Sequence, residues 1–297
     1  MMPSALVTGA GGFIGGKLAR RLLADGWSVD LLVRPSTVIP GDLSDARILQ
    51  FEGDTESLIP IVAEANPDVV FHLASLYLAD HSPEQVASLV ASNVLLAAQL
   101  AEAMTVSCSA GAARLVAAGT AWQHYRDAEY LPVNLYAATK QAADALLRYY
   151  VDARGLSLLT LKLFDTFGAG DTRRKLVQLL VDAAVSGDRL GMSPGEQTID
   201  ISHVDDVVDA FVVAGNRLLA AEGPLDESYF VSGERYRVRE LVGLVEQALG
   251  CRIDVVFGER PYRAREVMQP VTPAAEQILP GWAPRRKLAD TLPTLRG

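Results

Sequence analysis

Tyr136 and Lys140 are the pair of residues in this sequence best suited to proton transfer. They stand four positions apart in the segment 134–140, Asn-Leu-Tyr-Ala-Ala-Thr-Lys, so on a helix their side chains share one face. A tyrosine phenol titrates at about 10 unaided, and a lysine ammonium nearby favours the phenolate and lowers that pKa. The pair is therefore expected to exchange a proton with a substrate oxygen near neutral pH.

A glycine-rich segment near the N-terminus is the second chemical feature. Gly9, Gly12 and Gly15 follow an apolar strand that ends at Val7, in the pattern Gly-x-x-Gly-x-x-Gly, and a leucine-rich helical pattern comes next. Gly9 allows a tight turn, Gly12 lets the backbone approach a pyrophosphate, and Gly15 lets the helix pack close to the strand. Free N–H groups at the helix start then face phosphates, so the segment predicts a dinucleotide-binding site.

The segment 8–15, Thr-Gly-Ala-Gly-Gly-Phe-Ile-Gly, resembles the signature Thr-Gly-x-x-Gly-Phe-Ile-Gly of the extended short-chain dehydrogenase/reductase superfamily. This superfamily comprises the nucleotide-sugar epimerases, dehydratases and reductases. The resemblance covers nearly the whole chain and is most specific at residues 8–15, 119–140 and 162–175. Because Thr120 takes the superfamily's Ser/Thr position, which hydrogen-bonds the reacting oxygen, the implied catalytic residues are Thr120, Tyr136 and Lys140.

The resemblance also implies the fold and the division of the chain. We expect an α/β protein, a Rossmann doubly wound parallel sheet with a smaller C-terminal substrate-binding lobe. Residues 1–165 would form the NADP-binding core, rejoined by about residues 199–231, and residues 166–297 would form mainly the substrate-binding lobe. A homodimer through the two long helices, including residues 135–153, is implied by the resemblance alone.

The residue after the predicted strand 28–33 indicates which dinucleotide is bound. NAD enzymes tend to place Asp or Glu there to bind the ribose diol, whereas here the position is Arg34. An arginine pairs with a 2′-phosphate, and Ser36 offers a hydroxyl donor nearby. The sequence therefore favours NADP(H) over NAD, the alternative being a solvated arginine at a strand end.

Other cofactor contacts follow from the resemblance. Asp54 would meet the adenine amino group, unless it is a simple turn aspartate, and residues 73–75 would run beneath the phosphate–ribose arm. His72, inside a strand, is expected to be a hydrogen-bonded core residue, and Asn93 matches a family asparagine that supports the active-site region. The predicted cofactor-binding residues are Gly9, Gly12, Phe13, Ile14, Gly15, Arg34, Ser36, Asp54, Leu73, Ala74, Ser75, Tyr136 and Lys140.

The loop after Thr120 resembles one group of enzymes within this superfamily. Segments 119–125, Gly-Thr-Ala-Trp-Gln-His-Tyr, and 132–140 are similar to the reductases that make CDP-3,6-dideoxyhexoses, the abequose and paratose synthases, which reduce a C4 ketone with NADPH. Sugar-nucleotide 4,6-dehydratases place Asp-Glu directly after the threonine; Ala121 and Trp122 stand there and cannot act as acid or base. Dehydration is therefore disfavoured. Residues implied over the sugar are Trp122, Gln123, His124 and Tyr125, with loop packing an equal alternative for Trp122 and Tyr125.

Basic residues are predicted to bind the substrate's diphosphate. Three cations, Arg173, Arg174 and Lys175, precede a predicted helix at 176–186, which suits an anion, although a solvated basic turn is the alternative. We therefore expect Arg174 and Lys175 to bind the diphosphate. The resemblance adds Arg263 or Arg265. Asp165 stands where many relatives have a diphosphate-binding Asn, and an ionised carboxylate cannot take over that donor role.

Composition limits the classes of partner. The 297 residues carry a net charge of −9, which argues against nucleic acid and anionic membrane surfaces as partners. We expect no apolar run long enough to span a bilayer, no signal peptide, and a cytoplasmic protein. Cys108 and Cys251 form neither a disulfide framework nor a metal pattern, so no metal is predicted and reduced buried thiols are expected.

Together these features predict NADPH-dependent reduction of the C4 ketone of a nucleotide-linked 4-keto-deoxyhexose. CDP is the nucleotide that the resemblance favours, and dTDP, GDP and UDP stay open. One alternative is an NAD-dependent nucleotide-sugar 4-epimerase using the same three residues, against which Arg34 argues. An alternative of another class is a non-catalytic NADP-binding regulatory protein, against which the intact Thr120, Tyr136 and Lys140 argue.

Overall fold

A seven-stranded parallel sheet carries the candidate site. The computed structural model describes residues 2–108, 111–173 and 175–296. The strand order is β3-β2-β1-β4-β5-β6-β10, and every neighbouring pair is parallel. The chain order therefore reverses between β1 and β4, where open α/β sheets bind ligands. The strands are β1 (Ser4–Thr8), β2 (Ser28–Val33), β3 (Arg47–Gln50), β4 (Val69–His72), β5 (Arg114–Thr120), β6 (Ser157–Leu163) and β10 (Asp226–Val231).

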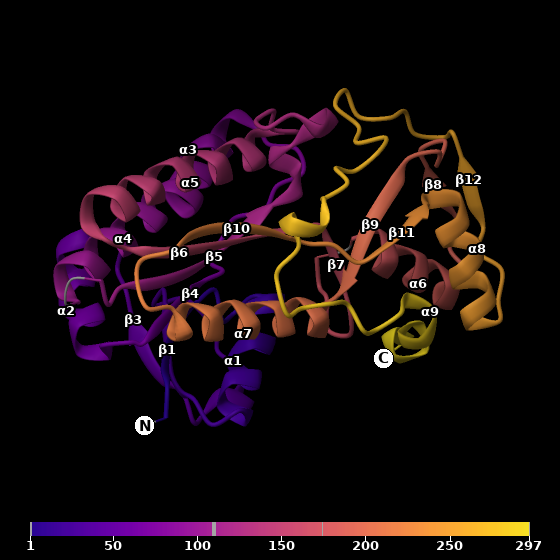
Figure 1. The fold of residues 1–297 in the computed structure, drawn as a ribbon. Coiled ribbons are helices and arrows are strands. Elements are labelled where there is room, and N and C mark those ends of the chain that lie inside the picture. Colours follow the sequence, from indigo (N-terminus) through magenta and orange to yellow (C-terminus); the bar gives the residue numbers. More distant parts are fainter. Residues whose placement is uncertain (1, 109–110, 174, 297) are drawn as a thin grey trace.

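Helices cover both faces of this sheet (Figure 1). On one face α1 (Phe13–Ala24) packs with α7 (Val204–Ala220), and on the other α2 (Thr55–Ala65) packs with α4 (Leu96–Ser107), which also contacts α5 (Leu135–Arg154). Neighbouring strand residues serve opposite faces, since Val7 belongs to the first core and Leu6 to the second. The predicted Rossmann doubly wound sheet is confirmed.

One helical segment corrects an expectation about membranes. Pro83–Ser107 is, by length and composition, long and apolar enough to cross a bilayer. It comprises a 3-10 turn (Pro83–Gln85), α3 (Val86–Val90), a π-helical turn (Ala91–Leu95) and α4. Its residues Leu100 and Met104 lie in the core against the sheet. A core helix of a soluble protein passes the same test of length and composition.

The smaller C-terminal part holds two further sheets (Figure 1). Strands β7 (Asp165–Phe167), β9 (Thr198–His203) and β11 (Glu234–Arg237) form one, and β8 (Leu190–Met192) with β12 (Val255–Phe257) forms the other. A third core lies beneath them, built with α6 (Leu176–Ser186), α8 (Val238–Leu249) and α9 (Leu288–Thr291). The boundary at residue 165 and the substrate-binding role of this part stay predictions.

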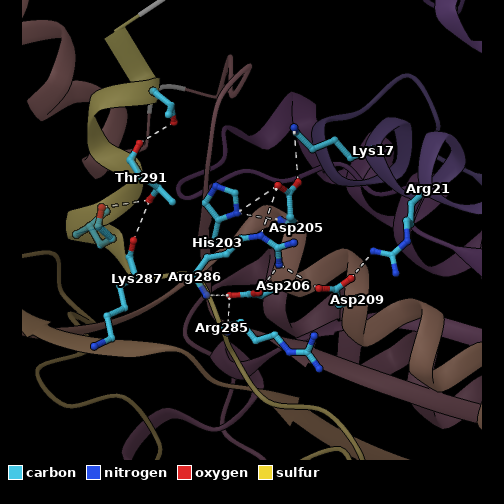
Figure 2. Close-up of polar contacts among 12 residues, drawn as sticks. Lys17, Arg21, His203, Asp205, Asp206, Asp209, Arg285, Arg286, Lys287 and Thr291 are labelled. Atoms are coloured by element: carbon cyan, nitrogen blue, oxygen red, sulfur yellow. Dashed lines mark hydrogen bonds and ion pairs between the residues drawn. The ribbon is translucent and has the colours of Figure 1, made fainter. Parts of the chain in front are cut away.

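An ion-pair cluster ties the C-terminal segment to α7 and α1 (Figure 2). Arg286 pairs with Asp206 and Asp209 and lies 3.8 Å from Asp205. Helix α7 starts at Val204, and its N-cap is His203, whose Nδ1 accepts from the Asp205 N–H at 3.2 Å. The carboxylates of Asp205 and Asp206, in the first turn, face arginine and lysine side chains instead of capping the helix.

Candidate active site

The glycine turn between β1 and α1 has no room for side chains. Gly9 has φ +79°, and a Cβ on it would lie 2.6 Å from the Ala74 nitrogen. A Cβ on Gly15 would lie 2.2 Å from the Gly9 oxygen. The N-cap of α1 is Gly12 and offers no side-chain hydrogen bond, so the first N–H groups of the helix remain available to an anion. This cradle fits the pyrophosphate of a dinucleotide.

A cavity of about 190 Å³ opens over this turn at the carboxyl ends of the parallel strands. It brings together residues that are distant in sequence: the glycine turn, the strand ends and α5. The predicted residues in its lining are Gly9, Gly12, Phe13, Ile14, Gly15, Leu73, Ser75, Thr120, Trp122, Tyr136, Lys140 and Lys175. Tyr77 and Arg173 line it too and were absent from the predicted site.

Four predicted cofactor residues lie outside this lining. Arg34 and Ser36 are exposed on the turn after β2, which a Thr37 N–H to Arg34 carbonyl hydrogen bond closes at 2.9 Å. Asp54 is the N-cap of α2 and accepts from the Ser57 N–H at 2.8 Å. The backbone N–H of Ala74 donates to Thr8 Oγ1. Contacts of these four residues with a cofactor stay predictions.

Tyr136 holds its proton more tightly than the sequence suggested. Burial raises its pKa to about 12, although a hydrogen bond with Ser75 and the charge of Arg173 oppose the shift. Its ring packs edge-on against Tyr77, with 5.1 Å between centroids. The phenol is therefore protonated at neutral pH, and a lowering of its pKa by Lys140 stays a prediction.

Lys140 lines the same cavity and is almost fully buried. Burial lowers its pKa to about 8, and the charge of Asp144, one turn further along α5, opposes that shift. Lys140 is consequently charged at neutral pH but close to its titration. The helix that carries it starts at Asn134, whose side chain accepts from the Ala137 N–H at 2.9 Å.

Thr120 ends β5 and presents its hydroxyl to the cavity. Its Oγ1 accepts from the Trp122 N–H at 3.3 Å, which leaves the hydroxyl hydrogen free to donate to a substrate oxygen. Ala121 and Trp122 follow, so no carboxylate stands directly after Thr120.

Two polar residues behind the site have the supporting roles that were predicted. Asn93 lies in the π-helical turn, accepts from the Leu76 N–H at 2.8 Å, and donates to Thr139 at 2.9 Å. His72 hydrogen-bonds Thr8 at 2.9 Å in the core. Burial and the charge of Lys140 lower the pKa of His72 to about 3, so it is neutral.

A second cavity of about 840 Å³ adjoins the first and shares Tyr77, Trp122, Phe164 and Lys175 with it. It lies between the end of β5, α6 and the segment after β12. The predicted substrate residues in its lining are Trp122, His124, Tyr125, Lys175, Arg263 and Arg265. Arg174 lies outside the described residues.

One expectation for the loop after Thr120, the placement of Gln123, needs correction. Gln123 does not lie over a sugar: its side chain is fully buried, 0% exposed, and faces α5. His124 lines the larger cavity, but both ring nitrogens have protein partners. Its Nδ1–H donates to the Ala128 carbonyl at 3.2 Å, and Nε2 accepts from Lys162 at 2.7 Å.

Cations and aromatic rings meet where the two cavities join. Lys175 donates to Asp165 at 2.6 Å and lies 4.8 Å from the Tyr77 ring centroid. Arg173 pairs with Asp171 and lies 4.7 Å from the Phe13 ring centroid. The Arg173 side chain therefore bridges the glycine turn and the larger cavity. Its membership of the basic triplet was the available sequence signal.

Two further cations lie on the segment after β12. Arg265 lies 5.0 Å from the Tyr125 ring centroid, and Arg263 faces Asp80 at 3.9 Å. Both are partly exposed to the larger cavity, where an anionic ligand can compete for them.

Comparison with known proteins shows the family to which this chain belongs. The sequence model of the NAD dependent epimerase/dehydratase family matches residues 5–225, and the chain belongs to this family. It is an NAD(P)-dependent enzyme that modifies nucleotide sugars, as its predicted membership of the extended short-chain dehydrogenase/reductase superfamily implied.

Individual relatives differ in activity. The CDP-abequose synthase of Yersinia pseudotuberculosis is 27% identical over 271 residues, covering 89% of this chain and 90% of that protein. The UDP-glucose 4-epimerase of Mycolicibacterium smegmatis is 29% identical over 311 residues, covering 96% and 95%. The structure of MoeE5 in complex with UDP-glucuronic acid and NAD is 27% identical, with a TM-score of 0.83, covering 99% of this chain and 97% of that one.

Proposed function

We propose that this enzyme reduces the C4 ketone of a nucleotide-linked 4-keto-deoxyhexose with NADPH, and that the nucleotide is CDP. The observation that carries the proposal is the geometry of the small cavity, where Thr120, Tyr136 and Lys140 line one space with the glycine turn and no carboxylate follows Thr120. A ketone reductase needs a proton donor at the start of each turnover, whereas oxidation of a sugar hydroxyl first needs a base. A protonated phenol beside the free hydroxyl hydrogen of Thr120 suits the reductive direction.

NADPH bound along the glycine turn would supply the hydride to the C4 carbon. Gly9, Gly12 and Gly15 would hold its pyrophosphate, and Arg34 its 2′-phosphate. Tyr136 donates its proton to the alkoxide that develops at the C4 oxygen, and Thr120 donates a hydrogen bond to the same oxygen. Positioned proton transfer of this kind contributes about 10²- to 10⁴-fold to the rate.

The larger cavity is proposed to hold the nucleotide sugar. Its volume of about 840 Å³ lies within the range of small-molecule sites. The cations Arg173, Lys175, Arg263 and Arg265 in its lining suit a diphosphate. Trp122 and Tyr125 provide apolar surface for the sugar, and Ala121 and Trp122 leave no acid or base after Thr120 for dehydration.

A homodimer in the cytoplasm is also proposed. Apolar side chains are exposed on adjoining helical segments, and each of them is 38–56% exposed. They are Val86 and Val90 of α3, Leu95 of the π-helical turn, and Leu146 and Tyr149 of α5. Such a patch on a helical face suits burial against a second copy.

An NAD-dependent 4-epimerase is the second candidate function. It is favoured by the UDP-glucose 4-epimerase relatives, one of which is 29% identical over 311 residues. An epimerase would use Thr120, Tyr136 and Lys140 in both directions of hydride transfer and would retain its cofactor.

The test is NADPH oxidation, followed by near-ultraviolet absorbance, with CDP-4-keto-6-deoxyhexose and CDP-4-keto-3,6-dideoxyhexose as substrates. We expect rapid loss of NADPH, little loss of NADH, and no turnover by Tyr136→Phe, which keeps the ring but lacks the proton. Absence of oxidation with both cofactors, together with NAD released when the protein is denatured, would instead indicate the epimerase. A Tyr136→Phe variant with undiminished turnover would contradict the assigned role of the phenol.

A further inference from the structure

A buried amide and a carboxylate join the strand that carries Thr120 to the helix that carries Lys140. Gln123 Oε1 accepts from the Thr120 N–H at 3.0 Å. On the other side, Gln123 Nε2 donates to Asp144 Oδ2 at 2.7 Å and to Gln141 Oε1 at 2.8 Å. Asp144 follows Lys140 by one turn of α5. A single side chain therefore fixes the end of β5 against the middle of α5.

The strand leaves space for this amide. A Cβ on Gly119 would lie 3.1 Å from Gln123 Oε1 and 3.0 Å from Thr160 Cγ2. Both distances are closer than ordinary contacts between carbon and its neighbours, so any larger residue at position 119 would displace the Gln123 carbonyl or its surroundings. The lack of a side chain at Gly119 therefore leaves the room that the Gln123 amide needs to make its hydrogen bonds.

Asp144 also contributes a negative charge to the site, although burial raises the pKa of its own carboxyl. It lies near two lysines, Lys140 and Lys162, and its charge opposes the lowering of both pKa values by burial. Lys162 in turn donates to His124, whose other nitrogen donates to a backbone carbonyl, so His124 is a neutral acceptor and brings no charge. The remaining titratable groups that face this cluster are His72 of β4, Tyr136 and Arg148 of α5, and Glu129.

We propose that Gln123 and Asp144 are positioning residues, which hold Thr120 and Lys140 in register and keep the Lys140 ammonium charged in its buried position. The pair is called the Gln123–Asp144 clasp below. It rests on the proposed function only in taking Thr120 and Lys140 as the groups that act on the substrate. The hydrogen-bonding role and the charge role can be tested separately, because Gln123 supplies hydrogen bonds alone, whereas Asp144 supplies hydrogen bonds and a charge.

The first experiment replaces Asp144 by Asn, which keeps an oxygen to accept from Gln123 but removes the charge. The chain has five lysines, so their ε-carbon signals can be assigned by NMR and titrated individually. We expect Lys140 to titrate about one to two pH units lower in Asp144→Asn, since a carboxylate one helical turn away in a partly buried site has an effect of this size. Asp152→Asn, an exposed residue of the same helix, is the matched control and should leave Lys140 unchanged.

The pH dependence of kcat gives the second readout. The alkaline limb of the Asp144→Asn profile should move to lower pH by the same amount as the Lys140 titration, while the Asp152→Asn profile should coincide with the wild type. A merely structural role for Asp144 would lower kcat without moving the limb. An unchanged Lys140 titration in Asp144→Asn would overturn the charge role.

Exchanging the amide and the carboxylate between positions 123 and 144 tests the hydrogen-bonding role of the pair. Gln123→Glu places a second carboxylate against Asp144 and removes the donor, so we expect at least a tenfold loss of kcat. Gln123→Glu/Asp144→Asn restores one amide and one carboxylate in reversed places, and it should recover most of that loss and most of the Lys140 pKa. A double variant no better than Gln123→Glu would overturn the clasp.

The NMR titration needs no turnover, which keeps the two proposals distinguishable. If the wild type fails to oxidise NADPH with any keto sugar, the proposed function fails and the Lys140 titration alone decides the clasp. If the wild type is active and the titration does not respond to Asp144→Asn, the clasp fails and the proposed function stands.

Discussion

Asp206 and Arg286 form an ion pair, and we expect the protein to be destabilised by different amounts when one or the other partner is removed. Asp206 lies at the start of α7 with its side chain 1% exposed, whereas the Arg286 side chain is 34% exposed. The Asp206 carboxylate accepts from the backbone N–H groups of Arg285 and Arg286 at 3.1 and 2.9 Å, and from the Arg286 guanidinium (Figure 2). This cluster attaches the C-terminal segment to the helix that packs on the large sheet.

Removing either partner leaves a different charge behind. In Arg286→Met, the almost fully buried carboxylate of Asp206 loses its counter-charge, and breaking a buried pair in this way costs about 3–5 kcal/mol. In Asp206→Asn, the charge left behind is Arg286, which is part-exposed and still has Asp209 at 3.0 Å. Losing one charged hydrogen bond then costs about 1.5–3 kcal/mol. We therefore expect Arg286→Met to be the more destabilising change.

Urea unfolding at pH 7, followed by circular dichroism, measures both free energies of unfolding. Arg252→Met is the control: Arg252 also pairs with a glutamate, at 3.3 Å, but its side chain is 93% exposed, so the change should cost less than about 1 kcal/mol. The double variant Arg286→Met/Asp206→Asn should cost less than the sum of the single variants, because both remove the same interaction. An Arg286→Met variant that costs no more than Arg252→Met, or an Asp206→Asn variant that is the costlier single change, would contradict these assigned roles of the two charges.

The remaining predictions concern the cofactor turn, the core and the dimer. Gly15→Ala should abolish detectable dinucleotide binding by calorimetry, because its Cβ would lie 2.2 Å from a backbone oxygen, whereas Gly41→Ala meets nothing within 4 Å and should bind normally. Since burial lowers the pKa of His72 to about 3, the unfolded chain binds a proton first as the pH falls below about 6.5. Stability should therefore fall by about 2 kcal/mol between pH 6.5 and pH 5, and less in His72→Gln; an equal loss in both would contradict this. Leu146→Glu, at an exposed site of α5, should convert the proposed dimer to a monomer in sedimentation, and an unchanged mass would exclude that face.

Local patterns predicted the elements that carry the site. The bounds expected for β2 and α6 are those observed, because each is an apolar pattern closed by a clear end signal, such as the glycine after α6. The glycine turn was equally predictable from its spacing. Gly15 is required by a contact with Gly9 within the turn itself, and Gly9 by a contact with the backbone at residues 73–74, after the neighbouring strand β4.

Long-range burial set the limits of the sequence analysis. Gln123 belongs to a motif shared with sugar-nucleotide reductases, so it was expected in the substrate cavity, but its partner Asp144 is 21 residues away and only the packing of α5 on β5 joins them. The pKa of Tyr136 likewise depends on burial beside Tyr77, which nothing in the Tyr-x-x-x-Lys spacing indicates. The capping of α7 by His203, which accepts from the Asp205 N–H, depends on side-chain directions that sequence patterns do not give.

The most direct test of the central claim follows the hydride itself. The enzyme would be incubated with CDP-4-keto-3,6-dideoxyhexose and NADPH that carries deuterium at the transferable position, and the sugar product would be analysed by mass spectrometry and NMR. The proposed reduction predicts deuterium at C4 in every product molecule formed. Unconsumed NADPH and an unchanged ketone would contradict reduction. Conversion of UDP-glucose to its C4 epimer without uptake of deuterium would then indicate that the hydride comes from and returns to the substrate.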